Sequence, residues 1–270
     1  MLKRLSVISL MFVLSSFLIV GCGGGENNNG RANTGKKEYA PTGDEGTITG
    51  TIAFEGTAPA RKTIPMAADC AAIPGEKLTE NVIVTDGKLA NVFLYVKGGP
   101  VGDYSFKTPS DAATLDQKGC RYIPHVFGVQ TGQTIKILNS DNTTHNIHPS
   151  PKNNPEWNEV QSAGAPPKEK KFNREDILIP VKCNQHPWMQ SYIGVLGHPF
   201  YAVSGEDGSY SIEGLPPGDY TVHAWHEQYG EQTQKVTVAA KDSKTQDFTF
   251  SPKMAYAPTA LRVEPALILP

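Results

Sequence analysis

The chain lacks a strong charge of either sign, and it lacks the periodicity of amphipathic helices. Its 270 residues carry 25 Lys and Arg against 27 Asp and Glu, so the formal net charge is only −2. The one dense basic run, residues 168–171, is most simply a solvated loop, and nothing in the charge pattern indicates a nucleic-acid partner. Because no stretch after the N-terminal apolar run has convincing helical periodicity, we expect an all-β fold.

Cysteine is also scarce, and the first of only four closes the apolar run at the N-terminus. Residues 5–20 are apolar apart from serines and follow a basic start, which is typical of a secretory signal and too short for a membrane span. The run ends in Leu-Ile-Val-Gly-Cys at residues 18–22, which resembles the lipobox of bacterial lipoproteins. The resemblance implies a signal peptide over residues 1–21, lipidation of Cys22 and anchoring at the outer membrane, on its periplasmic face or at the cell surface. The alternative is an ordinary cleaved signal with an incidental cysteine.

Both ends of the remaining chain show little pattern. Residues 22–45 are rich in Gly, Asn and Lys with few apolar residues, so we expect a flexible tether that holds the folded part off the membrane. Residues 253–270, with three prolines, are expected to form a tail.

Residues 181–189, Val-Lys-Cys-Asn-Gln-His-Pro-Trp-Met, place three potential metal ligands on one short loop. Cys183 offers a thiolate, His186 follows three residues later with an imidazole, and Met189 follows three residues after that with a thioether. Soft sulfur ligands and imidazole together suit copper, zinc or iron. One Cys, two His and a weak axial Met describe a mononuclear blue-copper electron-transfer centre. The loop therefore predicts such a site, with one imidazole still to be found.

The second imidazole is expected from His145. It lies after an alternating apolar run at residues 134–139, which predicts a strand, and directly before Asn146. His148 is the substitute ligand if this loop folds differently. The other four histidines, His125, His198, His223 and His226, have no spacing that demands a metal. A second site among His125, His198 and His226 stays open.

With these residues the sequence resembles a cupredoxin of the plastocyanin type. The resemblance is carried by the His145-Asn146 pair, by Cys-x2-His beginning at Cys183, and by Met189. It departs from plastocyanins in the last interval, since two residues rather than four separate His186 from Met189. The resemblance implies one copper ion, alternating between Cu(I) and Cu(II), with the two histidines, the cysteine and the methionine as its ligands.

The same resemblance implies roles for the neighbours of the ligands. Asn146 is expected to hold the two ligand loops together through hydrogen bonds. His186 is expected near the surface, where electrons would leave. Pro187 and Trp188 would then form the apolar patch on which a redox partner docks.

Counting the cysteines leaves one pair. If Cys22 is lipidated and Cys183 binds metal, Cys70 and Cys120 are the natural partners for a disulfide in an oxidising compartment. The alternative is that one of these two is a metal ligand or a free thiol.

Short runs of alternating apolar residues predict the strands, most clearly at residues 47–54, 91–96, 120–129 and 134–139. A further strand at 177–183 has Ile177, Ile179, Val181 and Cys183 on one face and Pro180 on the other, so the thiol is expected to point inward. The proline-rich residues 149–171 are expected to form a long loop.

A different signature follows the metal loop. Residues 205–222 read as turn, strand, tight Pro-Gly turn and strand, and they closely resemble the carboxypeptidase regulatory-like (transthyretin-like, or prealbumin-like) β-sandwich. The resemblance implies that residues 46–100 and 197–252 form that sandwich together, interrupted by a cupredoxin-type Greek-key sandwich at 101–196. Two consecutive sandwiches, divided at residue 197, are the alternative.

Together these patterns predict a lipid-anchored copper protein that carries single electrons and is not an enzyme. Its expected partners are the membrane, through the lipid anchor, and a redox protein such as a c-type cytochrome or an oxidoreductase. The alternative is a non-catalytic binding or structural lipoprotein whose copper site is vestigial or stores metal. Copper-dependent catalysis would need an open coordination position or a second metal, and only the histidines outside the ligand set support that possibility.

Overall fold

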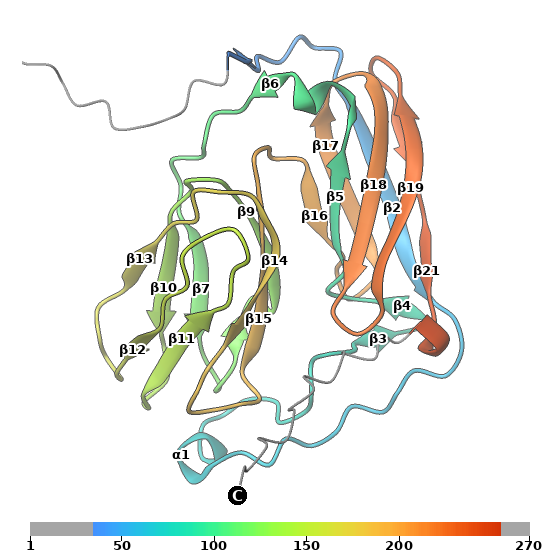
Figure 1. The fold of residues 1–270 in the computed structure, drawn as a ribbon. Helices are drawn as coiled ribbons and strands as arrows, with labels where there is room; N and C mark the ends of the chain where they lie inside the picture. The colour runs from blue at the N-terminus through green and yellow to red at the C-terminus, as the bar shows by residue number, and fades with distance from the viewer. Residues whose placement is uncertain (1–34, 255–270) are drawn as a thin grey trace, which may run out of the picture. The chain divides into compact units, whose positions relative to one another are not determined.

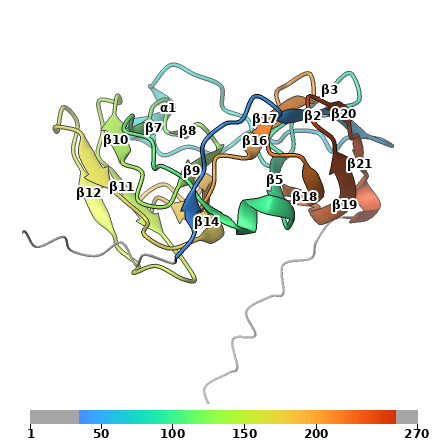
Figure 2. The same ribbon diagram turned by 90° about the horizontal axis from the view of Figure 1, so that it is seen from above.

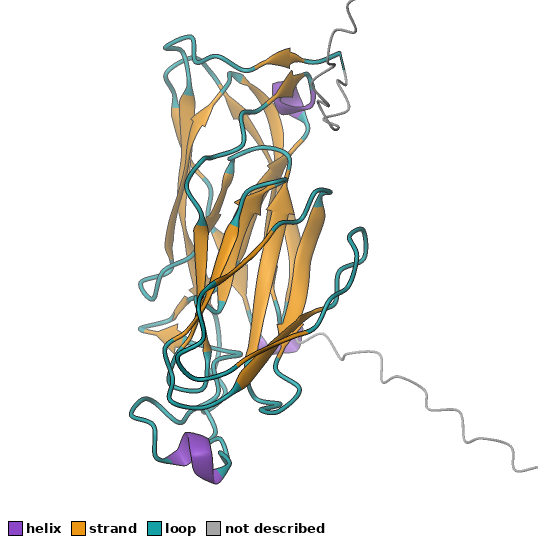
Figure 3. Cartoon of the chain, turned by 90° about the vertical axis from the view of Figure 1, so that its left-hand side faces the viewer, coloured by secondary structure: helices purple, strands orange, loops and turns teal. Residues whose placement is uncertain are grey.

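The computed structural model describes residues 35–254, which are mainly β-strands joined by loops and turns (Figure 3). In this part of the chain the helical segments are short: α1 (Ala68–Ala71), η1 (Gly99–Gly102) and η2 (Pro252–Met254). The prediction of an all-β fold is therefore confirmed. Within the described range, no helix has the length and apolar character needed to cross a bilayer. The predicted signal peptide, the predicted lipidation site Cys22 and most of the predicted tail lie outside the described residues.

One set of strands comes from the two ends of the described chain, and we call it the terminal sandwich (Figure 1). Its first sheet has the order β16-β5-β18-β19, and its second has the order β17-β2-β4-β3. Strands β20 and β21 also pair with β2 and lie beside it in Figure 2. The strands are β2 (Gly46–Phe54), β3 (Val84–Thr85), β4 (Lys88–Leu89), β5 (Phe93–Lys97), β16 (Tyr201–Val203), β17 (Ser209–Leu215), β18 (Gly218–His226), β19 (Gly230–Val238), β20 (Ser243–Thr245) and β21 (Phe248–Phe250).

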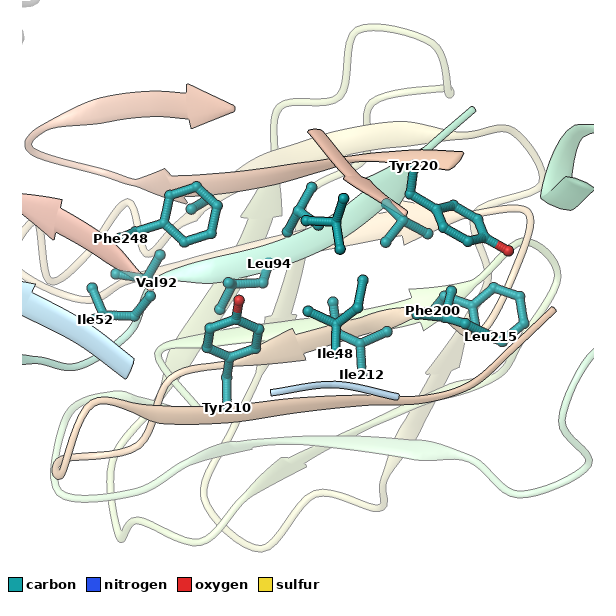
Figure 4. Close-up of a cluster of buried hydrophobic side chains, with 14 of the residues drawn as sticks. Ile48, Ile52, Val92, Leu94, Phe200, Tyr210, Ile212, Leu215, Tyr220 and Phe248 are labelled. Atoms are coloured by element: carbon teal, nitrogen blue, oxygen red, sulfur yellow. The ribbon is translucent and has the colours of Figure 1, made fainter. Parts of the chain in front are cut away.

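The core of the terminal sandwich follows from the alternation seen in the sequence. Along β2, Ile48, Ile52 and Phe54 are buried, while the residues between them are partly exposed. Figure 4 shows Ile48 and Ile52 on the side of β2 that faces the other sheet of this sandwich, which carries Leu94 and Tyr220. Full burial of one such side chain contributes about 1.5–3 kcal/mol, so this pattern fixes which face of each strand turns inward.

The second set of strands lies between β5 and β16 in the chain, and we call it the inserted sandwich. Its two sheets have the orders β13-β10-β7-β8 and β12-β11-β14-β15-β9. The strands are β7 (Ala113–Gln117), β8 (Tyr122–Ile123), β9 (Val126–Gln130), β10 (Ile135–Asn139), β11 (His145–Pro149), β12 (Glu159–Gln161), β13 (Lys168–Lys170), β14 (Asp176–Lys182) and β15 (Gln190–Leu196).

The ladders of the terminal sandwich join residues far apart in the sequence. Strand β2 pairs with β17, from Thr51 opposite Ser209 onward, and β5 pairs with both β16 and β18. This is the pairing that the interrupted arrangement of the two sandwiches requires. The segment around Cys70 departs from the expected boundary at residues 46–100, because Cys70 is buried among residues of the inserted sandwich.

Two glycines opposite each other explain how the sandwiches meet. Gly128 of β9 pairs with Gly194 of β15 in a parallel ladder. A Cβ atom at Gly194 would lie 2.3 Å from the ring of Phe93, and one at Gly128 would lie 2.3 Å from the ring of Tyr201. These two rings of the terminal sandwich stack on each other at 5.8 Å between centroids. The glycines therefore leave the space that the aromatic pair fills.

Three predictions of local structure were wrong. The tether ends before residue 45, because β1 (Lys37–Glu38) pairs with β6 (Tyr104–Ser105) and the Tyr39 ring packs 5.2 Å from the Phe106 ring. The loop predicted for residues 149–171 contains β12 and β13, which pair with β11 and β10. In β14 a bulge at Leu178, whose φ is 60°, turns Ile177 away from the face that Ile179 and Cys183 share. Pro180 is exposed, as predicted.

His226, at the end of β18, gives the terminal sandwich a pH dependence. Burial, followed by the nearby His125, lowers the pKa of His226 to about 3. The unfolded chain protonates this imidazole near its ordinary pKa of about 6.5. Below that pH the unfolded state binds more protons than the folded state, so stability is lost as the pH falls.

We expect the substitution His226→Asn to reduce the change of unfolding free energy with pH. The asparagine oxygen can still accept the hydrogen bond that the Gln228 backbone N–H donates to Nδ1 of His226 at 3.1 Å. Between about pH 7.5 and about pH 5, the wild-type chain should lose about 2 kcal/mol more free energy of unfolding than the variant. Urea unfolding of both proteins at the two pH values measures this. Equal losses would mean that His226 is protonated in the folded state.

Candidate metal centre

Three potential ligands come from two neighbouring strands of the inserted sandwich. His145 is the first residue of β11, and Cys183 follows the last residue of β14. His186 lies in the turn that leads into β15. That turn is fixed by its backbone, because Met189 N–H donates to the His186 carbonyl at 2.9 Å and Cys183 N–H donates to the Met189 carbonyl at 3.2 Å. The short spacing of the sequence motif is thus a tight connection between two paired strands.

The ring nitrogens and the sulfur converge on one point. Nδ1 of His145 lies 3.0 Å from Nδ1 of His186, and Sγ of Cys183 lies 3.8 Å from the latter. All three residues are buried, with the imidazole of His145 fully inaccessible to solvent. They form one of three groups of potential metal ligands found within residues 35–254.

Carboxylates on the far side of each ring explain why both Nδ1 atoms point inward. Nε2 of His145 lies 2.9 Å from an oxygen of Asp141, and Nε2 of His186 lies 3.1 Å from an oxygen of Asp69. An ionised carboxylate only accepts hydrogen bonds, so each Nε2 must carry the proton. A ring that is neutral and carries its proton on Nε2 presents the lone pair of Nδ1, and the two Nδ1 atoms face each other. Two lone pairs 3.0 Å apart repel each other unless a positive charge lies between them.

The protonation state of His145 suits a ligand. Burial lowers its pKa, against the hydrogen bond and the charge of Asp141, which raise it, and the net direction is downward. Asp141 is itself anchored, because it accepts from the backbone N–H groups of Gly119 at 2.7 Å and Cys120 at 2.8 Å. His145 is therefore a neutral, oriented imidazole at neutral pH.

The spacing of these atoms fits a small metal ion with soft ligands. Three ligands at about 2.0–2.3 Å from a metal, arranged in a trigonal plane, stand about 3.5–3.8 Å from one another. The 3.8 Å between Sγ of Cys183 and Nδ1 of His186 lies in this range, and the 3.0 Å between the two Nδ1 atoms lies below it. Two imidazole nitrogens and one thiol are the donor set of a trigonal His2Cys site. The residues present therefore fit a copper ion without a change of fold.

Asn146 joins the two ligand segments. Its side-chain oxygen accepts from the backbone N–H of Asn184 at 2.7 Å and from the Cys183 thiol at 3.3 Å. Its amide nitrogen donates to the Asn158 side chain at 2.7 Å. These are contacts of the kind that the resemblance to cupredoxins implied, and they hold the thiol at a fixed distance from β11.

The two remaining sequence candidates are placed differently. Met189 is buried beside Cys183 in the core of the inserted sandwich, so it belongs to the same cluster. His148 lies three residues beyond His145 on β11 and turns to the other side, where its ring nitrogens contact Asn184 and Glu156. The structure does not bring His148 to the convergent group, because neighbouring faces of a strand alternate.

His186, predicted to lie near the surface, is itself buried beneath the exposed side chain of Asp69. Its exposed fraction is 3%, since Asp69 from α1 covers its Nε2 edge and the Trp188 ring packs 5.2 Å from its own ring. Trp188 is half-buried and donates from Nε1 to the Cys120 carbonyl at 3.1 Å, whereas Pro187 is exposed.

Cys70 and Cys120, the predicted pair, are joined by a disulfide with an S–S distance of 2.03 Å. This bond ties α1, which contains Asp69, to the loop at Gly119 and Cys120, whose backbone N–H groups donate to Asp141.

The sequence analysis did not identify the two carboxylates, Asp69 and Asp141, that contact the imidazoles. Asp141 lies only four residues before His145, and that proximity is the one signal that was available for it. Asp69 has no such signal, because it lies 117 residues from His186.

The spare histidines are engaged elsewhere. His125 contacts Glu227 at 2.5 Å and the Gln190 carbonyl at 3.1 Å, and His226 stacks on Tyr229. His198 is buried beside Phe200, and burial lowers its pKa. Among residues 35–254, none of these three histidines belongs to a group of three potential metal ligands.

Comparison with protein families identifies one of the two sandwiches. Residues 193–251 match the family model of the carboxypeptidase regulatory-like domain, which confirms the prediction of that sandwich. A comparison with curated protein sequences finds no significant match.

Similarity to solved structures is partial. Amicyanin from Paracoccus versutus is 19% identical over 33% of this chain and 85% of its own, with a TM-score of 0.28. A purple cupredoxin from Nitrosopumilus maritimus is 21% identical over 31% of this chain and 98% of its own, with a TM-score of 0.27. A copper-containing nitrite reductase from Thermus scotoductus is 15% identical over 50% of this chain and 28% of its own, with a TM-score of 0.28.

Proposed function

We propose that this chain is a mononuclear copper protein that carries single electrons. The observation that carries the proposal is the convergence of two imidazole Nδ1 atoms and one thiol at 3.0 and 3.8 Å, with each imidazole held from behind by a carboxylate. Such an arrangement costs free energy unless it binds a cation, because it concentrates the lone pairs of three buried donors in one place, beside the buried carboxylate of Asp141.

The donor set favours copper over zinc. Structural zinc sites use four Cys or His ligands, and the convergent group here offers three. A thioether such as that of Met189, buried in the same core, is a soft ligand that suits copper. We therefore assign His145, Cys183 and His186 as the trigonal ligands and Met189 as the axial one. A copper ion held there would supply one-electron chemistry between Cu(I) and Cu(II).

The residues around the ligands support electron transfer rather than catalysis. Each ligand side chain is buried and held by a second group: Asp141, Asp69 and Asn146. Ligands fixed in this way move little when the charge of the metal changes, and they exclude water from it. Both properties favour rapid transfer of an electron and disfavour the binding of a substrate to the metal.

The cellular setting belongs to the same proposal. The basic, apolar N-terminus and the lipobox-like residues 18–22 support export and lipidation at Cys22, with the protein anchored at the outer membrane. The disulfide between Cys70 and Cys120 agrees with an oxidising compartment. Its redox partner would be another protein, such as a c-type cytochrome or an oxidoreductase, docking near Pro187 and the half-buried Trp188.

Titration of the purified chain with Cu(II) tests the proposal. We expect an intense visible thiolate-to-copper band that saturates at one equivalent, together with a higher melting temperature in the presence of Cu(II) or Zn(II). A chain that remains colourless and whose melting temperature does not respond to either metal would overturn the proposal and favour a binding or structural role. Saturation at two equivalents would instead favour catalysis at a second metal.

A further inference from the structure

We infer that Asp69 is a positioning residue for the metal centre, delivered to it by the disulfide-linked segment around α1. The inference rests on the proposed function and deepens it. It states that a carboxylate distant in the sequence orients His186 and lowers the reduction potential of the site. Its basis is the contact of 3.1 Å between Asp69 Oδ2 and His186 Nε2.

Asp69 is held in place by more than this one contact. The same oxygen, Oδ2, accepts from the Thr143 hydroxyl at 2.9 Å, and Thr143 lies two residues before His145. The next residue, Cys70, is bonded to Cys120 and is fully buried. The Lys77 ammonium donates to the Cys70 carbonyl at 3.1 Å, which closes the segment on itself. The carboxylate is therefore fixed to the ligand loop from two sides.

The geometry gives the carboxylate two effects. First, it keeps the proton of His186 on Nε2, so that Nδ1 is free and faces Nδ1 of His145. Second, its negative charge stands behind the imidazole, on the side away from the metal position, and favours the more highly charged state of a metal bound to Nδ1. Asp141 acts on His145 in the same way. The site thus has one carboxylate behind each imidazole, a known means of raising the basicity of a ligand and fixing its tautomer.

The test of the charge effect is Asp69→Asn, which keeps an oxygen of similar position and removes the charge. We expect the affinity for Cu(II) to fall about 10- to 100-fold, with a smaller loss for Cu(I), so that the reduction potential rises. If the Cu(II) affinity alone falls tenfold, the rise is 59 mV for a one-electron couple. Asp44→Asn is the matched control, because Asp44 has a similarly exposed side chain, at 55% against 45%, and pairs with Lys241 instead. Asp69→Glu should restore part of the effect.

A second measurement tests the positioning without any metal. Nitrogen NMR of the metal-free chain should show His186 with a protonated Nε2 and a bare Nδ1, and Asp69→Ala should convert this signal to a mixture of tautomers or to rapid proton exchange. An unchanged tautomer in Asp69→Ala, together with an unchanged potential in Asp69→Asn, would overturn the inference. If the wild-type chain binds no copper, the proposed function fails, and the NMR result still decides whether Asp69 orients His186.

Discussion

Replacing Cys183 with serine is expected to abolish the visible band of the copper-loaded chain completely, while leaving the fold intact. The thiolate is the only soft anionic donor among the three convergent residues, and the intense band of such sites arises from that sulfur. Serine is close in size, and its hydroxyl can still donate to the Asn146 oxygen that the thiol contacts at 3.3 Å. The loss should therefore be one of colour and affinity. Visible absorption and the copper stoichiometry of both proteins, at equal concentration, measure it.

The control for this experiment lies on β11, the strand that pairs with β14. His148→Gln alters an imidazole that contacts Asn184 and Glu156 and does not converge with the others, so it should keep the full band. Retention of the band in Cys183→Ser would show that another group supplies the sulfur-to-metal transition. If His148→Gln loses the band while its melting temperature is unchanged, His148 is a copper ligand in place of His145.

The convergence of the proposed ligands could be predicted from sequence because their geometry is local. Cys183, His186 and Met189 lie within a single turn between two paired strands, so their spacing alone brings them together. His145 was predicted from its place after a strand and directly before Asn146, and the ladder from His148 to Lys182 brings its strand beside β14. Where a site is built from adjacent strands, the pattern of the chain carries enough information to name its residues.

The surroundings of the ligands could not be predicted in this way. The prediction that His186 lies near the surface rested on the resemblance to cupredoxins, and it did not include the cover that Asp69 of α1 gives the ring. That segment lies before β3 in the chain and was assigned to the terminal sandwich. It reaches the metal centre because the Cys70–Cys120 bond and the burial of both cysteines hold it there. No local sequence pattern in residues 59–81 indicates that this segment packs against the candidate metal centre.

Backbone irregularities also limited the prediction of the fold, because alternation of apolar residues does not indicate where a bulge occurs. The alternation in β2 was regular and its burial followed the prediction, whereas β14 contains a bulge at Leu178 that no alternation rule anticipates. Past the bulge, Ile179, Val181 and Cys183 share one buried face. The inward direction of the thiol could therefore be predicted, because the parity is intact between the bulge and the ligand.

Removing the disulfide is expected to lower the free energy of unfolding by about 4 kcal/mol. The two cysteines are 50 residues apart, and a cross-link that closes a loop of this length restricts the unfolded chain by about that amount. The double variant Cys70→Ala and Cys120→Ala tests this by urea unfolding of the metal-free chain. Both residues are fully buried, so alanine avoids placing a hydroxyl in the core.

Chemical reduction of the wild-type chain is the control, because it breaks the same bond without changing a side chain. The reduced protein and the double variant should agree to about 1 kcal/mol, the difference being the small cavity left by the two sulfurs. The two proteins should also share the tautomer mixture of His186 that Asp69→Ala produces, because α1 is then no longer tied to the ligand loop. A loss below about 1 kcal/mol with an unchanged tautomer would mean that Thr143 and Lys77 hold the segment in place without the disulfide. The stability and the orientation of the ligand are separate consequences of one bond, since the first acts on the unfolded chain and the second on the folded site.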